Sequence, residues 1–122
     1  MTRVLIVDDQ PAFRRQLRVL LTLAGLEVVA EAGDIESAEE QVRLYHPGLA
    51  IVDVILPDVS GMEGVPRLKA LAPEMRVILV SAYHERIWEE AAQAAGAEAF
   101  VPKDELDLAL AQSWADGEGE AK

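Results

Sequence analysis

The chain has 122 residues and no cysteine, so it has neither a disulfide framework nor a thiolate metal site, and a reducing cytosol suits it. Twenty-two acidic residues against eleven basic ones give a formal net charge of −11, which makes direct binding to nucleic acid unfavourable. About half of the residues are apolar, as in folded domains, yet no apolar run is long enough for a signal peptide or a membrane span. We therefore expect a cytoplasmic protein without membrane contact.

The N-terminal part predicts a strand, a helix and a second strand. The strand Arg3–Val7 contains VLIV, a continuous apolar run typical of strands covered on both faces. A helix is expected to begin at Pro11 and to end just before Gly25, because proline favours the first helical position and glycine the position after the last. The second strand, Leu26–Glu31, follows directly.

The same alternation continues in the next segment. Asp34 is a candidate N-cap for a helix over Ile35–Tyr45, and Pro47 lies beyond the end of that helix. The third strand, Leu49–Asp53, contains another continuous apolar run, LAIV.

The third helix has two possible starts. Ser60 and Glu63 have the spacing of a capping box, but Pro66 lies where it would kink a helix that begins there. The helix could instead span about Val65–Leu71, and the sequence does not decide between the two.

Two further strand and helix pairs follow. The strand Met75–Val80 precedes a helix over about His84–Ala95, which Gly96 ends. The strand Ala97–Val101 precedes a helix from Asp104 to about Ala115.

Five strands, each followed by a helix through a short connection, predict a βα repeat. The expected fold class is α/β and flavodoxin-like: a doubly wound five-stranded parallel sheet of order 2-1-3-4-5 with helices on both faces. We assign residues 1–116 to this one domain. Residues 117–122 are polar and rich in Gly and Glu, as in a tail or the start of a linker, so the sequence leaves open whether the chain stands alone or belongs to a longer protein.

Polar residues follow the predicted strands at one edge of the sheet. Asp8 and Asp9 follow the first strand, and Asp53 ends the third. Ser81 follows the fourth strand, and Lys103 comes shortly after the fifth. In such a sheet the carboxyl ends of the strands form the crevice in which ligands bind, so we expect these groups to lie together.

Carboxylates this close repel one another unless a cation lies between them. At about 4 Å and an effective dielectric constant of 20, the repulsion of two charges is roughly 4 kcal/mol. A hard divalent cation removes it, and Mg²⁺ suits a site of few carboxylates and several waters. With Lys103 and the Ser81 hydroxyl nearby, the arrangement predicts that Asp53 accepts a phosphoryl group as a nucleophile.

The motifs VLIVDD, IVDVILPDVSG, VILVSA and AFVPK, in this order, resemble the receiver domain of two-component response regulators. The resemblance covers Val4 to about Trp114 and implies a CheY-like fold. It also implies that Asp53 takes its phosphoryl group from a histidine kinase or a phosphotransfer protein. The domain is then a phosphoprotein of signal transduction and not an enzyme, since it promotes only its own phosphorylation and dephosphorylation.

The resemblance assigns further roles around the phosphoacceptor. It implies that Asp9 binds Mg²⁺ directly and that Asp8 binds it largely through water. The backbone carbonyl of Ile55 and the carboxylate of Asp53 are the other implied ligands of the ion. Lys103 stands at the family's invariant basic position.

Two residues stand at the family's switch positions, the hydroxyl of Ser81 and the ring of Phe100. We expect phosphorylation to draw Ser81 toward the phosphate and Phe100 inward, which reshapes the face of the fourth helix, fifth strand and fifth helix. A partner or output domain reads this face, and the domain could dimerise through it. The pair Lys103-Asp104 is more typical of receivers joined to helix-turn-helix domains, so control of transcription is the expected output.

Ile55 and Tyr83 stand at the positions that flank the phosphoryl group in receivers, where they predict slow hydrolysis of the aspartyl phosphate.

A flavodoxin would need a Ser/Thr/Gly-rich loop where this chain has DDQPAF, and a haloacid-dehalogenase-type phosphatase would need Asp-x-Asp and a larger chain. The alternative that stays open is a receiver-shaped interaction module that works without phosphorylation.

Overall fold

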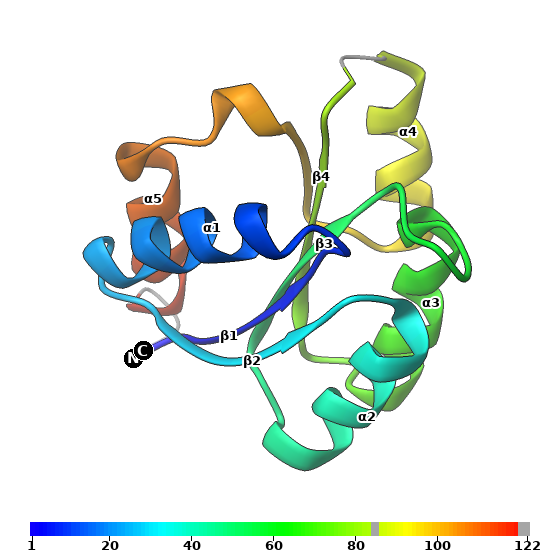
Figure 1. Ribbon diagram of the computed structural model, residues 1–122, viewed down its shortest axis with the longest axis horizontal. Coiled ribbons are helices and arrows are strands. Elements are labelled where there is room, and N and C mark those ends of the chain that lie inside the picture. The colour runs from blue at the N-terminus through cyan, green and yellow to red at the C-terminus, as the bar shows by residue number, and fades with distance from the viewer. Residues whose placement is uncertain (84–85, 120–122) are drawn as a thin grey trace.

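The computed structural model describes residues 1–83 and 86–119 as one five-stranded parallel sheet with helices on both faces (Figure 1). The strand order is β2-β1-β3-β4-β5, as the sequence predicted. The strands are β1 (Arg3–Val7), β2 (Glu27–Ala32), β3 (Leu49–Asp53), β4 (Arg76–Ser81) and β5 (Ala99–Pro102). The helices are α1 (Pro11–Leu23), α2 (Ile35–Tyr45), α3 (Gly61–Leu71), α4 (Arg86–Ala95) and α5 (Leu108–Gly119), with a short 3₁₀ turn at Lys103–Glu105.

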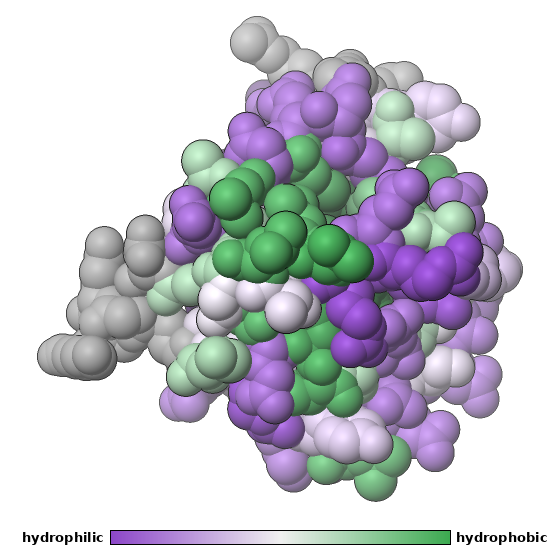
Figure 2. Space-filling model, turned by 60° about the vertical axis from the view of Figure 1, so that its left-hand side comes forward, coloured by the Kyte–Doolittle hydropathy of each residue, from purple (hydrophilic) through white to green (hydrophobic). Residues whose placement is uncertain are grey.

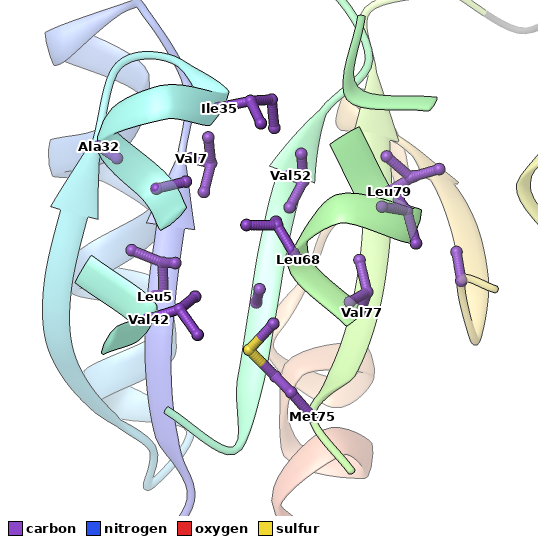
Figure 3. Packing of buried hydrophobic residues seen from close by; sticks show 14 of the residues in the cluster. Leu5, Val7, Ala32, Ile35, Val42, Val52, Leu68, Met75, Val77 and Leu79 are labelled. Atoms are coloured by element: carbon purple, nitrogen blue, oxygen red, sulfur yellow. The ribbon is translucent and has the colours of Figure 1, made fainter. Parts of the chain in front are cut away.

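Two apolar cores lie on the two faces of the sheet. One lies between the sheet and the helices α2, α3 and α4, and Figure 3 shows Leu5, Val52 and Leu79 of the central strands with Val42 and Leu68 of the covering helices. The other lies under α1 and α5, whose buried members include Leu21 and Trp114. Because both faces are covered, β3 is buried over its whole length, which explains its continuous apolar run.

The register of the sheet places the polar strand ends side by side. Val7 pairs with Val52, so Asp8 comes level with Asp53 at the centre of the sheet. Ser81 pairs with Pro102, which places Lys103 just beyond the same edge. The crevice predicted from the strand order therefore lies beyond the carboxyl ends of β1 and β3.

The ends of the first two helices agree with the prediction. Pro11 is the first residue of α1, and Gly25, just beyond its end, has a φ of +91°. Asp34 caps α2 by accepting a hydrogen bond from the backbone N–H of Ser37 at 2.8 Å. The left-handed residue after α2 is His46, with a φ of +47°.

The structure selects the earlier start for α3. The Oγ of Ser60 accepts a hydrogen bond from the N–H of Glu63 at 3.2 Å, so the helix begins at Gly61. Pro66 lies inside this helix, which continues to Leu71 without the backbone hydrogen bond that Pro66 is unable to donate.

The predicted start of the last helix was wrong. It begins at Leu108 and not at Asp104, because the Oδ1 of Asp107 accepts the N–H of Leu110 at 2.8 Å and so caps the helix there. The helix also runs to Gly119, beyond the expected Ala115. The first and third strands have the predicted ends, and the ends of the other three differ from the prediction by one or two residues. The expected start of the fourth helix, His84, lies outside the described residues.

The surface on the side of α1 and α5 is partly apolar. Figure 2 shows apolar side chains gathered in the middle of this side, between hydrophilic ones. Exposed apolar residues of the two helices are Val19, Leu23 and Leu108.

Within residues 1–83 and 86–119, no helix has the length and apolar character needed to cross a membrane. Every peptide bond in these residues is trans, that of Val101–Pro102 included.

Candidate functional site

Three acids meet at the carboxyl edge of the sheet, as predicted. One carboxylate oxygen each from Asp8, Asp9 and Asp53 lie within 4.8 Å of one another. Asp8 and Asp53 are buried, with relative exposures of 0% and 5%, whereas Asp9 is exposed. The cluster is therefore closed on the protein side and open to solvent at Asp9.

Lys103 joins the two buried acids. Its Nζ lies 2.8 Å from Oδ2 of Asp8 and 3.1 Å from Oδ2 of Asp53. Burial alone would lower the pKa of this ammonium, but the close ion pair with Asp8 and the charge of Asp53 raise it above its ordinary value. Lys103 is therefore held in the charged form beside both acids.

Asp53 has a strongly shifted acidity. The pKa of Asp53 is raised to about 6, chiefly by burial and also by the charge of Asp8, while the charge of Lys103 acts to lower it. A single ammonium thus does not offset burial and the second carboxylate. A perturbed carboxyl group in a cleft, with a defined charge partner, is typical of functional sites.

Each buried carboxylate is oriented by a local backbone group. Oδ1 of Asp8 accepts the N–H of Gln10 at 2.8 Å, and Oδ1 of Asp53 accepts the N–H of Ile55 at 3.2 Å. Both contacts span two residues and hold the side chain over the strand end.

The acid set fits a hard cation such as Mg²⁺. Oδ2 of Asp8 is fully buried and, although the Lys103 ammonium is close, receives no hydrogen bond of good geometry. A buried oxygen in this condition is a ready ligand. Three carboxylates with one exposed member match the preference of Mg²⁺ for few protein oxygens together with waters.

A pocket of about 210 Å³ opens over the cluster. It is lined by Asp9, Gln10, Asp53, Ile55, Ala82, Tyr83 and Lys103. Ile55 and Tyr83, the residues expected to flank the phosphoacceptor, therefore form part of its wall.

The two predicted switch residues have their described polar and ring contacts with residues other than the acids. Ser81 is buried, and its Oγ accepts the N–H of Tyr83 at 3.1 Å. Phe100 is half-buried and packs edge-on against Trp88, with ring centroids 6.2 Å apart. Trp88 in turn packs edge-on against Tyr83 at 6.3 Å, so an aromatic series connects the pocket wall to Phe100. Among the described residues, no hydrogen bond or ion pair joins Ser81 or Phe100 to the acids.

Gly61 supports Asp53 from behind. A Cβ on Gly61 would lie 2.1 Å from the backbone oxygen of Asp53, and the N–H of Gly61 bonds to the carbonyl of Val54 at 2.7 Å. The need for glycine is close approach of two backbones and not a positive φ, since the only glycines with positive φ in residues 1–83 and 86–119 are Gly25 and Gly96.

Three residues around the site had no signal in the sequence. The ring of Phe13 lies under Lys103, with its centroid 4.1 Å from Nζ. Arg14 donates from Nη1 to the backbone oxygen of Asp8 at 2.5 Å. Asp58 accepts the first N–H groups of α2, at 3.2 and 3.0 Å, and so ties the loop after Asp53 to that helix. Only a known spatial arrangement reveals these contacts, because their partners are distant in sequence or belong to the backbone.

A flavodoxin-like sheet with three acids and a lysine at its carboxyl edge defines a domain of the receiver type. The family model described as response regulator receiver domain matches residues 4–113. The chain therefore belongs to the receiver domains of response regulators, which are signalling domains of two-component systems.

Individual relatives agree with this assignment. A putative transcriptional regulator of Pseudomonas aeruginosa is 36% identical over 105 residues, 86% of this chain and 51% of the relative. The chemotaxis protein CheY of Thermotoga maritima is 32% identical over 101 residues, 83% of this chain and 84% of the relative. The signal receiver domain of the putative response regulator NarL from Mycobacterium tuberculosis has a TM-score of 0.86 at 28% identity, covering 99% of this chain and 98% of that one. The chain thus spans about half the length of the transcriptional regulator and most of CheY.

Proposed function

We propose that Asp53 accepts a phosphoryl group from the phosphohistidine of a histidine kinase or a phosphotransfer protein. The observation that carries this proposal is the position of the Lys103 ammonium, which contacts Asp8 and Asp53 beside a pocket that Asp53 and Lys103 themselves line. A stability role alone would not need a third acid, Asp9, at the mouth of the same site.

In the transfer, one carboxylate oxygen of Asp53 forms a bond to phosphorus while the P–N bond to the histidine breaks. The electron pair of that bond stays on the leaving imidazole nitrogen, which takes up a proton. Lys103 is in place to donate hydrogen bonds to the oxygens of the transferring group, where negative charge accumulates.

Asp8, Asp9, Asp53 and the Ile55 carbonyl are the proposed ligands of Mg²⁺. When bound, the ion supplies positive charge that stabilises the transferring phosphoryl oxygens. Asp8 and Asp53 are already oriented by their backbone hydrogen bonds, so the chain itself holds these carboxylates ready.

Ser81 and Phe100 are the proposed switch. Ser81 exchanges its contact with the N–H of Tyr83 for the phosphoryl oxygens, and Phe100 turns inward against Trp88. The face of α4, β5 and α5 then changes, and an output domain or partner protein, or a second copy of the chain, binds it. Transcription is the proposed output, supported by the similarity to a putative transcriptional regulator, and the cytoplasm the proposed location.

The pocket wall supports a long-lived phosphoryl group. Ile55 and Tyr83 both line the pocket beside Asp53, where an apolar side chain and a ring limit the approach of water. A phosphate half-life of only seconds in the isolated domain would contradict this part of the proposal.

The experiment is phosphorylation of the chain by acetyl phosphate, followed by intact mass, with and without Mg²⁺. We expect one phosphoryl group per chain, only with Mg²⁺, and binding of beryllofluoride under the same conditions. No labelling and no beryllofluoride binding would favour the second candidate, an interaction module that works without phosphorylation.

A further inference from the structure

The Lys103 ammonium has a third neighbour besides the two acids. The centroid of the Phe13 ring lies 4.1 Å from Nζ, within the range of a cation–π interaction. Two carboxylate oxygens and one ring therefore surround the nitrogen, and only 15% of the lysine side chain is exposed. The ammonium has three N–H bonds, and the negative face of the ring is a favourable neighbour on the side that the two carboxylates leave open.

The place of the ring is set by the start of α1. Pro11 begins this helix one residue after the acid pair, and Phe13 follows in its first turn. The ring packs against the core cluster under α1 and α5, which fixes its orientation from below. Arg14, the next residue, is bonded to the backbone oxygen of Asp8. The helix start is thus attached to the site on both sides of the ring.

Lys103 separates two hollows of the surface. It lines the pocket over the acids, and it also lines a groove of about 180 Å³ on the other side. The groove is formed by Phe13, Gln16, Leu17, Leu20, Lys103 and Leu106. A side chain at position 13 without an aromatic face would leave the ammonium free to turn into this groove and toward water, away from Asp53.

We propose that Phe13 is a positioning residue, whose ring holds the ammonium of Lys103 against Asp8 and Asp53 and so sets the rate at which Asp53 takes up a phosphoryl group. This inference rests on the function proposed above. Phe13 touches neither the phosphoryl group nor the metal, and acts only through Lys103. Leucine at position 13 keeps the apolar contact with the core but loses the ring face, whereas tyrosine keeps both.

The test compares Phe13→Leu with Phe13→Tyr in the full chain. We expect Phe13→Leu to lower the rate of labelling by acetyl phosphate, and the affinity for beryllofluoride, about three- to tenfold, as for the loss of a partly buried cation–π contact. Phe13→Tyr should restore both to within about twofold of the unmodified chain, since it keeps the ring. All rates are measured well below the thermal midpoint of each variant.

Leu20→Ala is the matched control. Leu20 lines the same groove and packs against the same core cluster, but it is not a neighbour of the acids. This variant should lose thermal stability while keeping the labelling rate. Equal slowing by Leu20→Ala and Phe13→Leu would show that loosening of the helix, and not the ring, is the cause.

A second measurement does not depend on phosphorylation. In NMR spectra, the ring should shift the ε-proton resonances of Lys103 upfield, and Phe13→Leu should abolish this shift. Labelling of Phe13→Leu at the unmodified rate, or failure of Phe13→Tyr to restore it, would overturn the inference. If the unmodified chain accepts neither a phosphoryl group nor beryllofluoride, the proposed function fails, and the NMR shift still decides whether Phe13 holds the ammonium.

Discussion

Two groups of acidic and basic side chains lie near the end of β1, and they differ in the ratio of acids to bases. In one, the carboxylate of Glu31 is paired with Arg14 at 2.9 Å and with Arg18 at 2.5 Å. In the other, Asp8, Asp9 and Asp53 lie together, and Lys103 is the one cation paired with Asp8 and Asp53. The first has two cations for one acid, and the second has three acids for one cation.

Acidity follows this difference in composition. Burial acts to raise the pKa of Glu31, but the two guanidiniums outweigh it and hold that pKa below its ordinary value. Burial and a second carboxylate raise the pKa of Asp53 to about 6. Three negative charges and one positive charge leave the second cluster with a net charge of −2, which one divalent cation neutralises. The Glu31 cluster is therefore suited to stability, and the acid cluster to binding a cation.

The largest expected effect comes from Asp53→Asn. An amide is not a nucleophile for phosphoryl transfer, so labelling by acetyl phosphate should be abolished. Intact mass measures the result, and Glu31→Gln is the matched control, which should label as the unmodified chain does. Persistent labelling of Asp53→Asn at the same stoichiometry would refute the assignment.

The next effect separates the two clusters by their response to Mg²⁺. Asp9→Asn removes the exposed acid, and we expect the Mg²⁺ affinity to fall at least about tenfold, as for loss of one charged metal ligand. Because Asp9 makes the repulsion worse in the metal-free chain, the thermal midpoint without Mg²⁺ should stay the same or rise. Calorimetric titration and thermal unfolding measure the two effects. A midpoint that falls would mean that Asp9 supports the fold itself.

Glu31→Gln should have the reverse pattern. It breaks two partly exposed ion pairs, so we expect the free energy of unfolding to fall by about 0.5 to 1 kcal/mol. Mg²⁺ affinity should not change. Chemical denaturation with and without Mg²⁺ checks both expectations, and a loss of Mg²⁺ affinity would show that Arg14 transmits the change to Asp8.

The smallest expected effect is the pH dependence of the difference in stability between the unmodified chain and Glu31→Gln. The folded pKa of Glu31 lies below its ordinary value of 4.5, so its stabilisation is present above pH 4.5 and is lost as the pH falls through the folded pKa. The stability gap between the unmodified chain and Glu31→Gln should therefore close in acid. Denaturation curves from neutral to acidic pH measure the gap. A gap that widens in acid would contradict a folded pKa of Glu31 below its ordinary value.

Much of the fold and of the acid cluster could be predicted because each followed from local patterns. Continuous apolar runs located the first, third and fourth strands, and the strand order then brought Asp8, Asp53 and Lys103 to one edge. Helix ends were harder. Asp104 and Asp107 both suit an N-cap by residue type, and only the hydrogen bond to Leu110 distinguishes them.

The supporting contacts could not be predicted in the same way. Phe13 reads as an ordinary apolar residue of an amphipathic helix, and its contact with Lys103 depends on how α1 packs beside the end of β5. Asp58 reads as a loop residue, yet its partners are backbone groups of α2. Such contacts depend on the packing of distant segments, which a local pattern does not contain.

The packing of Gly61 against Asp53 predicts which substitutions position 61 tolerates. A methyl group there would overlap the main-chain oxygen of Asp53, so even the smallest substitution would displace the backbone of the proposed phosphoacceptor. In a library of all amino acids at position 61, selection for signalling should therefore retain glycine alone, whereas the exposed neighbour Glu63 should accept many replacements.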